Sequence, residues 1–431
     1  MTALANIGKS VTGVFRRNPG KGGQSAQDEN GLDGMVEVED DVDASEFEDD
    51  ESQKTEKPKS RRPKETKFTQ QRIASFNPVL TPKSVLPIYF LLGALFLIFG
   101  GVMLNNARRV DEIYVFYQDC DKNAPTGDFA NVPDDHYQYT FHKDYNKDDL
   151  PIPQWKYVAD SDPDPEETQT GTCQLRFATP YALDGPLFIY YHIRNFFANH
   201  RRYVLSFSEY QIIGDKASLG QVKDNIGINC KPLVRNSEGK IYYPCGLIAN
   251  AMFNDTFSET MQVISEDTGN EVDTIALTNK NINWSSDKDR YKKTKYSPSD
   301  VVPPPYWKKQ FPDGYNDTNM PDIHEWEEFQ NWMRSPAFSK FSRLIKRYDS
   351  SLPKGTYQLD IDLHWPVTMY NGKKAVYITH GSSIGGRNTA PGIIYLVGGS
   401  ICFLLALISL ISHLTWGRAT ADTRLLSWNK S

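Results

Sequence analysis

The sequence lacks the motifs that mark nucleotide-binding and metallohydrolase sites. It contains no P-loop, no glycine fingerprint of a dinucleotide-binding fold and no H-E-x-x-H pattern. No basic patch alternates with aromatic residues and the net charge is −6, which argues against a nucleic-acid partner. One G-x-S-x-G match occurs at Gly381–Gly385. A hydrolase needs a strand before this motif, a helix after it, and Asp and His further along the chain. Here an apolar run begins within ten residues, and the only later histidine, His413, stands at the end of that run. We therefore expect no catalytic residues, no cofactor and no bound metal.

Long apolar runs are also scarce, since the mean hydropathy is −0.54 and only two uncharged twenty-residue stretches occur, Val85–Leu104 and Ile393–Ser412. At about 1.5 Å per residue, each run covers roughly the 30 Å hydrocarbon core of a bilayer. In lipid, backbone polar groups must be satisfied within their own segment, which favours a helix. A chain with only two apolar runs and a large polar remainder is not a polytopic transporter. The sequence predicts two transmembrane helices, 85–104 and 393–412, around a domain at 105–392.

Cysteine is rare, and its placement indicates the compartment. Charged residues flank both runs about equally, so charge does not give the orientation. Three N-x-S/T sequons and four of the five cysteines lie between the runs; the fifth cysteine, Cys402, is inside the second. These positions are Cys120, Cys173, Cys230 and Cys245 for the thiols, and Asn254, Asn283 and Asn316 for glycosylation. An even cysteine set with sequons is typical of an oxidising compartment. We expect a luminal or extracellular, glycosylated, disulfide-bonded domain and two cytosolic termini.

Four cysteines allow three disulfide pairings. Cys230 and Cys245 flank a segment whose Asn-Ser-Glu-Gly turn, residues 236–239, suits a hairpin between short strands. The hairpin favours the pair Cys230–Cys245 and leaves Cys120 with Cys173. A zinc site is not expected, because no C-x-x-C or Cys/His spacing of the required kind is present.

The first 84 residues are expected to be a disordered cytosolic tail, and residues 413–431 a short cytosolic C-terminal tail. Eleven acidic residues lie in Asp33–Glu51 and eight basic residues in Lys54–Arg72. Such blocks cannot bury enough apolar surface to offset chain entropy. Phe76–Pro82 differs, because its two prolines restrict it to an extended path into the first run.

Patterning between the runs favours strands over helices. Five segments are rich in β-formers, and the last two alternate as half-buried antiparallel strands do. They are Ile113–Tyr117, Leu187–His192, Tyr203–Phe207, Tyr357–His364 and Ala375–Thr379. One helical stretch, Asp322–Tyr348, has apolar residues at i, i+3 and i+4 and is interrupted by Pro336. The predicted domain is a mainly-β antiparallel sandwich with some helix, within an α+β membrane protein.

Several features leave alternatives open. Gly100-Gly101 and Gly398-Gly399 are either notches for helix packing or ordinary membrane glycines. Arg201 and Arg202 are either partner-binding or simply exposed. A two-span channel subunit has the same topology, but polar pore positions are scarce, with Ser400 and Ser409 the main candidates. A twice-anchored enzyme lacks a catalytic set.

Five longer stretches carry a specific resemblance. They are FNPVLTPKSVLP, NFFANHRRYVLSFSEYQ, INCKP with YYPCGLIANAMFNDTF, FQNWMRSPAF and HGSSIGGRN, in this order along the chain. Together they resemble the cell division control protein 50 family, the accessory β-subunits of type IV P-type ATPases, which are phospholipid flippases. The acidic VDASEFEDDE and the segments RRPKETKFTQQR and INWSSDKDRYKKTKY are similar to one yeast member of that family.

The resemblance implies a non-catalytic subunit in a 1:1 heterodimer with an ATPase that moves lipid from the outer to the cytosolic leaflet. The subunit would escort the ATPase out of the endoplasmic reticulum and remain bound. Its domain would be a sandwich that caps the luminal loops, and its helices would pack on the ATPase membrane domain. Likeness to the yeast member implies transport of phosphatidylcholine, phosphatidylethanolamine and lysophospholipids at the plasma membrane, reached through the Golgi and endosomes.

Overall fold

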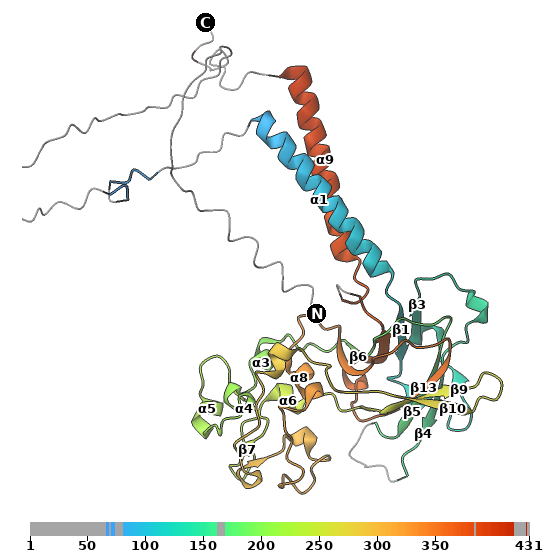
Figure 1. Cartoon of the computed structure of the whole chain (residues 1–431). Coiled ribbons are helices and arrows are strands. Elements are labelled where there is room, and N and C mark those ends of the chain that lie inside the picture. Colours follow the sequence, from blue (N-terminus) through green and yellow to red (C-terminus); the bar gives the residue numbers. More distant parts are fainter. Residues whose placement is uncertain are drawn as a thin grey trace, which may run out of the picture. The chain divides into compact units, whose positions relative to one another are not determined.

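The computed structural model describes residues 66–68, 70–73, 81–161, 169–382, 385–417 and 428 (Figure 1). All of the helices and strands given below lie within Pro78–Ser431. The acidic run 33–51 and nearly all of the two predicted tails lie outside the described residues.

Two long helices contain the two apolar runs. Helix α1 spans Pro82–Arg108 and helix α9 spans Ala390–Trp416, each with 27 residues. At 1.5 Å per residue each is about 40 Å long, enough to cross a bilayer. The N-terminus of α1 is fixed by Thr81, whose backbone N–H donates to Ser84 Oγ at 3.2 Å, and by proline in the first turn. Both predicted membrane helices are confirmed, and each extends beyond its apolar run at both ends.

The domain between the helices contains two antiparallel sheets. The first has the strand order β12-β6-β14-β1-β3, with bounds Phe341–Tyr348, Leu187–Arg194, Lys373–Thr379, Glu112–Phe116 and Tyr137–Thr140. The second has the order β10-β9-β13-β5-β4-β2, with bounds Glu271–Ala276, Thr260–Ile264, Gly355–Asp362, Thr172–Thr179, Gln154–Val158 and Ala130–Asn131. Strand β8 (Thr256–Phe257) also pairs with β13. Strands β1 and β14 connect the first sheet to the two membrane helices.

One hydrophobic core lies between the sheets. Val115 and Ile378 from the first sheet, and Leu175 and Leu359 from the second, are almost fully buried in the same cluster. Tyr191 stacks on Phe253 with ring centroids 4.0 Å apart. Two sheets that share one core form a sandwich, so the predicted fold class is confirmed.

A second lobe consists of short helices and long loops with its own aromatic core. Tyr243, Trp307 and Phe329 are buried there. Its α-helices are α3 (Arg201–Val204), α4 (Glu209–Ile212), α5 (Leu219–Lys223), α6 (Leu247–Asn250), α7 (Ser285–Lys288) and α8 (Glu327–Met333). The parallel strands β7 (Ile241–Tyr242) and β11 (Val301–Val302) pair in the same lobe.

Helix α2 (Cys120–Asn123) follows β1 in the sandwich. The 3-10 helices are Asp134–His136, Lys147–Asp149, Pro298–Asp300, Pro305–Trp307 and Thr368–Tyr370.

Two element predictions are wrong. The β-rich run Tyr203–Phe207 begins as the helix α3, because the His200 carbonyl oxygen accepts from the backbone N–H groups of Tyr203 and Val204. Tertiary packing against both cores overrides the local strand preference there. The expected helix Asp322–Tyr348 is real only at α8. Its second half is the strand β12, which pairs with β6 after the chain turns at Pro336.

Two further predictions hold in part. The turn at Asn236 is present, since the Asn236 N–H donates to the Lys240 carbonyl, but only a single bridge, Arg235 to Ile241, follows in place of two hairpin strands. Strand β14 is antiparallel as predicted, yet its residues from Lys374 to Thr379 are buried on both faces. It lies centrally between β6 and β1, and Tyr114 stacks over Tyr377 at 4.2 Å.

Candidate functional site

The two membrane helices pack along a seam of small residues. The buried residues of α1 are Gly93, Gly100 and Ala107, and those of α9 are Gly392, Gly399 and Ala406. Each set repeats every seven residues, which keeps one narrow stripe facing the partner helix. Aromatic rings border the seam, with Phe90 against Phe403 at 5.6 Å and Phe96 against Tyr395 at 5.5 Å.

The glycines allow the backbones to approach closely. A Cβ on Gly100 would lie 3.0 Å from the Gly392 carbonyl oxygen, and a Cβ on Gly392 would lie 2.8 Å from the Leu104 nitrogen. Close approach of this kind is how small residues stabilise helix pairs in lipid, where the hydrophobic effect contributes little. The sequence indicated notches at Gly100-Gly101 and Gly398-Gly399. Of these four, Gly100 and Gly399 are buried in the seam, whereas a Cβ on Gly101 would meet no described atom within 4 Å and one on Gly398 would be in ordinary contact with the Phe96 ring at 3.5 Å.

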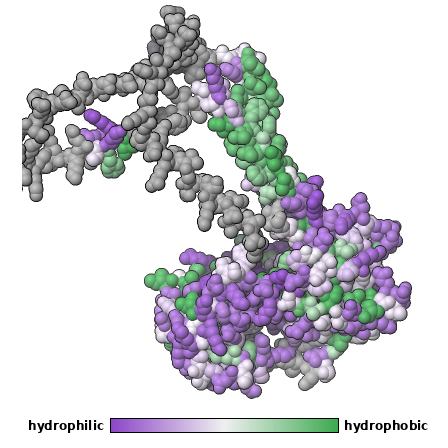
Figure 2. Space-filling model, viewed as in Figure 1, coloured by the Kyte–Doolittle hydropathy of each residue, from purple (hydrophilic) through white to green (hydrophobic). Residues whose placement is uncertain are grey.

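The outward faces of both helices are apolar and uncovered within the described residues. Figure 2 shows the hydrophobic surface concentrated along the helices, whereas most of the domain surface is hydrophilic. The exposed side chains include Ile88, Leu91, Ile98, Phe99, Val102, Ile394, Val397, Ile401, Leu404, Ile408 and Leu414. These faces suit lipid tails or further membrane helices.

A fully buried ion pair joins four segments of the sandwich. Lys374 Nζ of β14 lies 2.6 Å from Asp255 Oδ2, and both side chains have no exposed surface. Asp255 Oδ2 also accepts from the Tyr117 hydroxyl at 3.0 Å. Its Oδ1 accepts from the backbone N–H groups of His364 and Trp365, both at 2.7 Å. Lys374 donates a further bond to the Trp365 carbonyl oxygen at 2.9 Å.

Burial opposes the charges of this pair, but hydrogen bonds and the opposite charge satisfy both side chains. Burial lowers the pKa of the Lys374 ammonium group, and the adjacent Asp255 charge raises it part of the way back. Burial together with that same carboxylate raises the pKa of the Tyr117 phenol. Such a pair holds distant segments in register, because separating its members leaves a charge in the core. Nothing in the sequence pointed to it: the sequon Asn-Asp-Thr drew attention to Asn254 rather than to Asp255.

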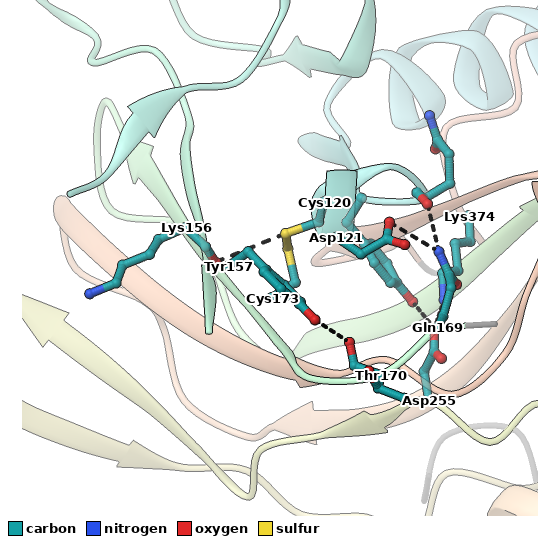
Figure 3. Close-up of a disulfide and its surroundings, with 11 residues drawn as sticks. Cys120, Asp121, Lys156, Tyr157, Gln169, Thr170, Cys173, Asp255 and Lys374 are labelled. Atoms are coloured by element: carbon teal, nitrogen blue, oxygen red, sulfur yellow. Dashed lines mark hydrogen bonds and ion pairs between the residues drawn. A yellow bond between two sulfur atoms is a disulfide. The ribbon is translucent and has the colours of Figure 1, made fainter. Parts of the chain in front are cut away.

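Two disulfides brace the domain. Cys120 at the start of α2 bonds to Cys173 in β5, close to the Lys374–Asp255 pair (Figure 3). Beside it, Tyr157 donates to the Thr170 carbonyl oxygen at 2.9 Å, and Gln169 donates to the Gln118 carbonyl oxygen at 2.8 Å. Cys230 bonds to Cys245 across 15 residues of sequence, and a small buried cluster that includes Val222 surrounds it. These are the two pairs that the hairpin argument favoured.

Comparison with known proteins decides the family. A family model described as the LEM3 (ligand-effect modulator 3) family / CDC50 family matches residues 103–419, which is most of the chain. The chain belongs to the CDC50 family. The resemblance that the five sequence stretches carry is therefore confirmed.

Relatives in this family match over nearly their whole length. The chain is 54% identical to the phospholipid-transporting ATPase accessory subunit LEM3 of Saccharomyces cerevisiae, over 91% of this chain and 93% of that protein. It is 38% identical to the accessory subunit CRF1 of the same yeast, over 88% and 92%. It is 31% identical to the cell cycle control protein 50A of Mus musculus, over 82% and 89%.

The remaining candidate residues of this CDC50-family chain are scattered over its surface. Arg201 and Arg202 are exposed on α3 and, with His200 and Lys231, line a surface pocket. In the turn that follows β14, Ser382 is hydrogen-bonded to Gly385, while Ser383 of the G-x-S-x-G match lies outside the described residues.

The three sequons differ in how their amides are engaged. Asn254 and Asn316 are exposed. Asn283 is half-buried, and its Nδ2 donates to Gln330 Oε1 at 2.8 Å while its Oδ1 accepts from Arg334 at 2.7 Å. Glycosylation remains a prediction at all three, with Asn283 the least accessible.

Proposed function

We propose that this chain is the non-catalytic accessory subunit of a phospholipid-transporting P-type ATPase of type IV, bound to it as a 1:1 heterodimer. The observation that carries the proposal is the 54% identity to an accessory subunit of that class over 91% of this chain. Length coverage matters here, because the family model takes in the end of α1, the whole domain and α9, and the match to that subunit extends over 91% of this chain.

The physical features support this role. The small-residue seam uses one face of each helix and leaves the others apolar, so the pair can pack on a larger membrane domain. The domain is rigidified by two disulfides and a buried ion pair, as suits a cap that must hold its shape. We propose that it covers the luminal loops of the ATPase and that the subunit escorts the ATPase from the endoplasmic reticulum.

The channel alternative has less support. A pore would require polar side chains that face a water-filled path. The Ser400 hydroxyl instead donates to the Leu396 carbonyl oxygen of its own helix at 2.8 Å. Its one hydroxyl proton is therefore donated within α9.

The proposed topology places both termini in the cytosol and the domain in the lumen or outside the cell. The disulfides and the sequons support this orientation. Glycopeptide mapping of the purified chain tests it. We expect glycans at the exposed Asn254 and Asn316 and lower occupancy at Asn283. A chain without glycans and with free thiols would contradict this topology and would place the domain in the cytosol.

Lipid uptake tests the transport role. We propose phosphatidylcholine, phosphatidylethanolamine and lysophospholipids as the lipids moved, at the plasma membrane. Yeast cells that lack their own accessory subunits of this class should regain uptake of a fluorescent phosphatidylcholine when they express this chain. Expression of the chain at the cell surface without any gain in uptake would contradict the proposal.

A further inference from the structure

A cluster of two histidines and one aspartate lies where both membrane helices join the first sheet. Asp111 stands between the end of α1 and the start of β1, and His380 follows the last residue of β14. Strand β1 lies between β14 and β3, with Glu112 opposite Thr379 on one side and Thr140 on the other. This register brings Asp111, His380 and His142 to the same end of three adjacent strands.

The three side chains are close enough to share one ion. Their potential ligand atoms all lie within 4.8 Å of one another. His142 Nδ1 is 2.8 Å from Asp111 Oδ1, and His380 Nε2 is 3.4 Å from Asp111 Oδ2. The Asp111 backbone N–H donates to His380 Nε2 at 3.1 Å, so this nitrogen is unprotonated, and it would exchange this hydrogen bond for the bond to a metal.

Asp111 has a buried carboxylate, and hydrogen bonds satisfy only one of its two oxygens. Its side chain is 1% exposed. Oδ1 accepts from the His142 backbone N–H and from the Tyr181 hydroxyl and is hydrogen-bonded to His142 Nδ1, whereas Oδ2 has no hydrogen-bond partner within the described chain. Among the described residues, its ion-pair contacts are the two imidazoles, and neither Lys nor Arg contributes one. A divalent ion held between the three side chains would place a fixed positive charge beside Oδ2.

We propose that Asp111, His142 and His380 form a zinc site at the junction of the sandwich and the membrane helices. Two imidazole nitrogens and one carboxylate oxygen form a donor set that Zn²⁺ prefers over Ca²⁺ or Mg²⁺, with a fourth position for water. The Tyr181 hydroxyl, bonded to Asp111 at 2.9 Å, would orient the carboxylate. Zinc would tie the chain after α1 to the chain before α9, independently of any ATPase.

Cobalt titration of the full-length chain in mild detergent tests the site. The chain should carry an affinity tag without histidine and be stripped of metal with a chelator. We expect the visible d–d absorption of tetrahedral Co²⁺ to saturate at one equivalent and to disappear when Zn²⁺ displaces the cobalt. Elemental analysis of untreated protein should find one zinc per chain. If the spectrum remains identical to that of aqueous Co²⁺ throughout the titration, the proposal is overturned.

Matched variants locate the site. His142→Gln and His380→Gln should each weaken Zn²⁺ binding at least tenfold, while His200→Gln, at the exposed histidine just before α3, should bind as the wild type does. Equal binding by all three would show that the metal binds elsewhere and would overturn the assignment. Should a cluster variant fail to fold, the wild-type cobalt spectrum still decides the question.

Discussion

Gly93 of α1 and Gly399 of α9 face each other so closely that a Cβ on either would meet the carbonyl oxygen of the other, at 3.3 and 3.0 Å. This reciprocal contact sets the distance between the two helices. The pair therefore presents one composite apolar surface to its surroundings.

We expect Gly399→Ile to lower the apparent melting temperature of the full chain in mild detergent. The added side chain would collide with Leu97 and with the Gly93 backbone, and overpacking of this kind costs about 1–3 kcal/mol. Gly101→Ile is the matched control, because a Cβ there meets no described atom. Equal melting of the two variants would contradict the seam.

Lys374→Met should destabilise the domain by about 3–5 kcal/mol, because it leaves the Asp255 carboxylate buried without its cation. Denaturant unfolding followed by tryptophan fluorescence measures the loss. Trp365, whose carbonyl oxygen accepts from Lys374, lies beside the pair. Lys373→Met changes an exposed neighbour on the same strand and should unfold at the wild-type denaturant concentration. A shared midpoint would show that the ion pair contributes nothing.

Replacement of both Cys230 and Cys245 by serine should weaken association with the ATPase. Loss of a 15-residue closure costs about 3 kcal/mol in the loop-entropy model and would loosen the cluster around Val222. Co-purification and delivery to the cell surface report the effect. Cys402→Ser removes the free thiol of α9 and should change neither. Normal assembly of the double variant would exclude this disulfide from the partner-binding scaffold.

His192 makes the domain less stable in acid. Burial, with help from Arg194 and Lys340, lowers the pKa of His192 to about 3. The ring is 2% exposed, and its Nε2 accepts from Arg194 while Nδ1 is bonded to the Ser342 hydroxyl at 2.8 Å. The unfolded chain would bind a proton near pH 6.5 that the folded chain refuses, so stability falls as the pH drops below that value.

At pH 5 the cost from His192 is about 2 kcal/mol, relative to pH 7 or above. Unfolding free energies measured between pH 7 and pH 5 should fall less steeply in His192→Gln than in the wild type. Parallel profiles would show that this histidine does not titrate as its burial requires.

The sequence predicted those elements that are recognisable from their own length or periodicity. The runs at 85–104 and 393–412 and the strands near Ile113 and Leu187 carry enough periodicity or length to be recognised alone. The sequence also contains the pattern that identifies the seam between the two helices. Small residues recur every seven positions in both helices, at Gly93, Gly100 and Ala107 and again at Gly392, Gly399 and Ala406.

Contacts between distant segments were not predictable from one sequence. Asp255 and Lys374 are 119 residues apart, and the sequon that contains Asp255 carries no sign of a buried ion pair. The strand Phe341–Tyr348 shows the same limit, since its identity comes from pairing with β6 rather than from its own pattern. Likewise, Asp111, His142 and His380 come together only through the order of β14, β1 and β3.

Purification of the tagged full-length chain in mild detergent, with mass identification of the proteins that co-elute, tests the accessory-subunit role most directly. The account predicts a type IV P-type ATPase present in roughly equimolar amount. A clean homo-oligomer without any ATPase would contradict it and would favour the two-span channel subunit instead.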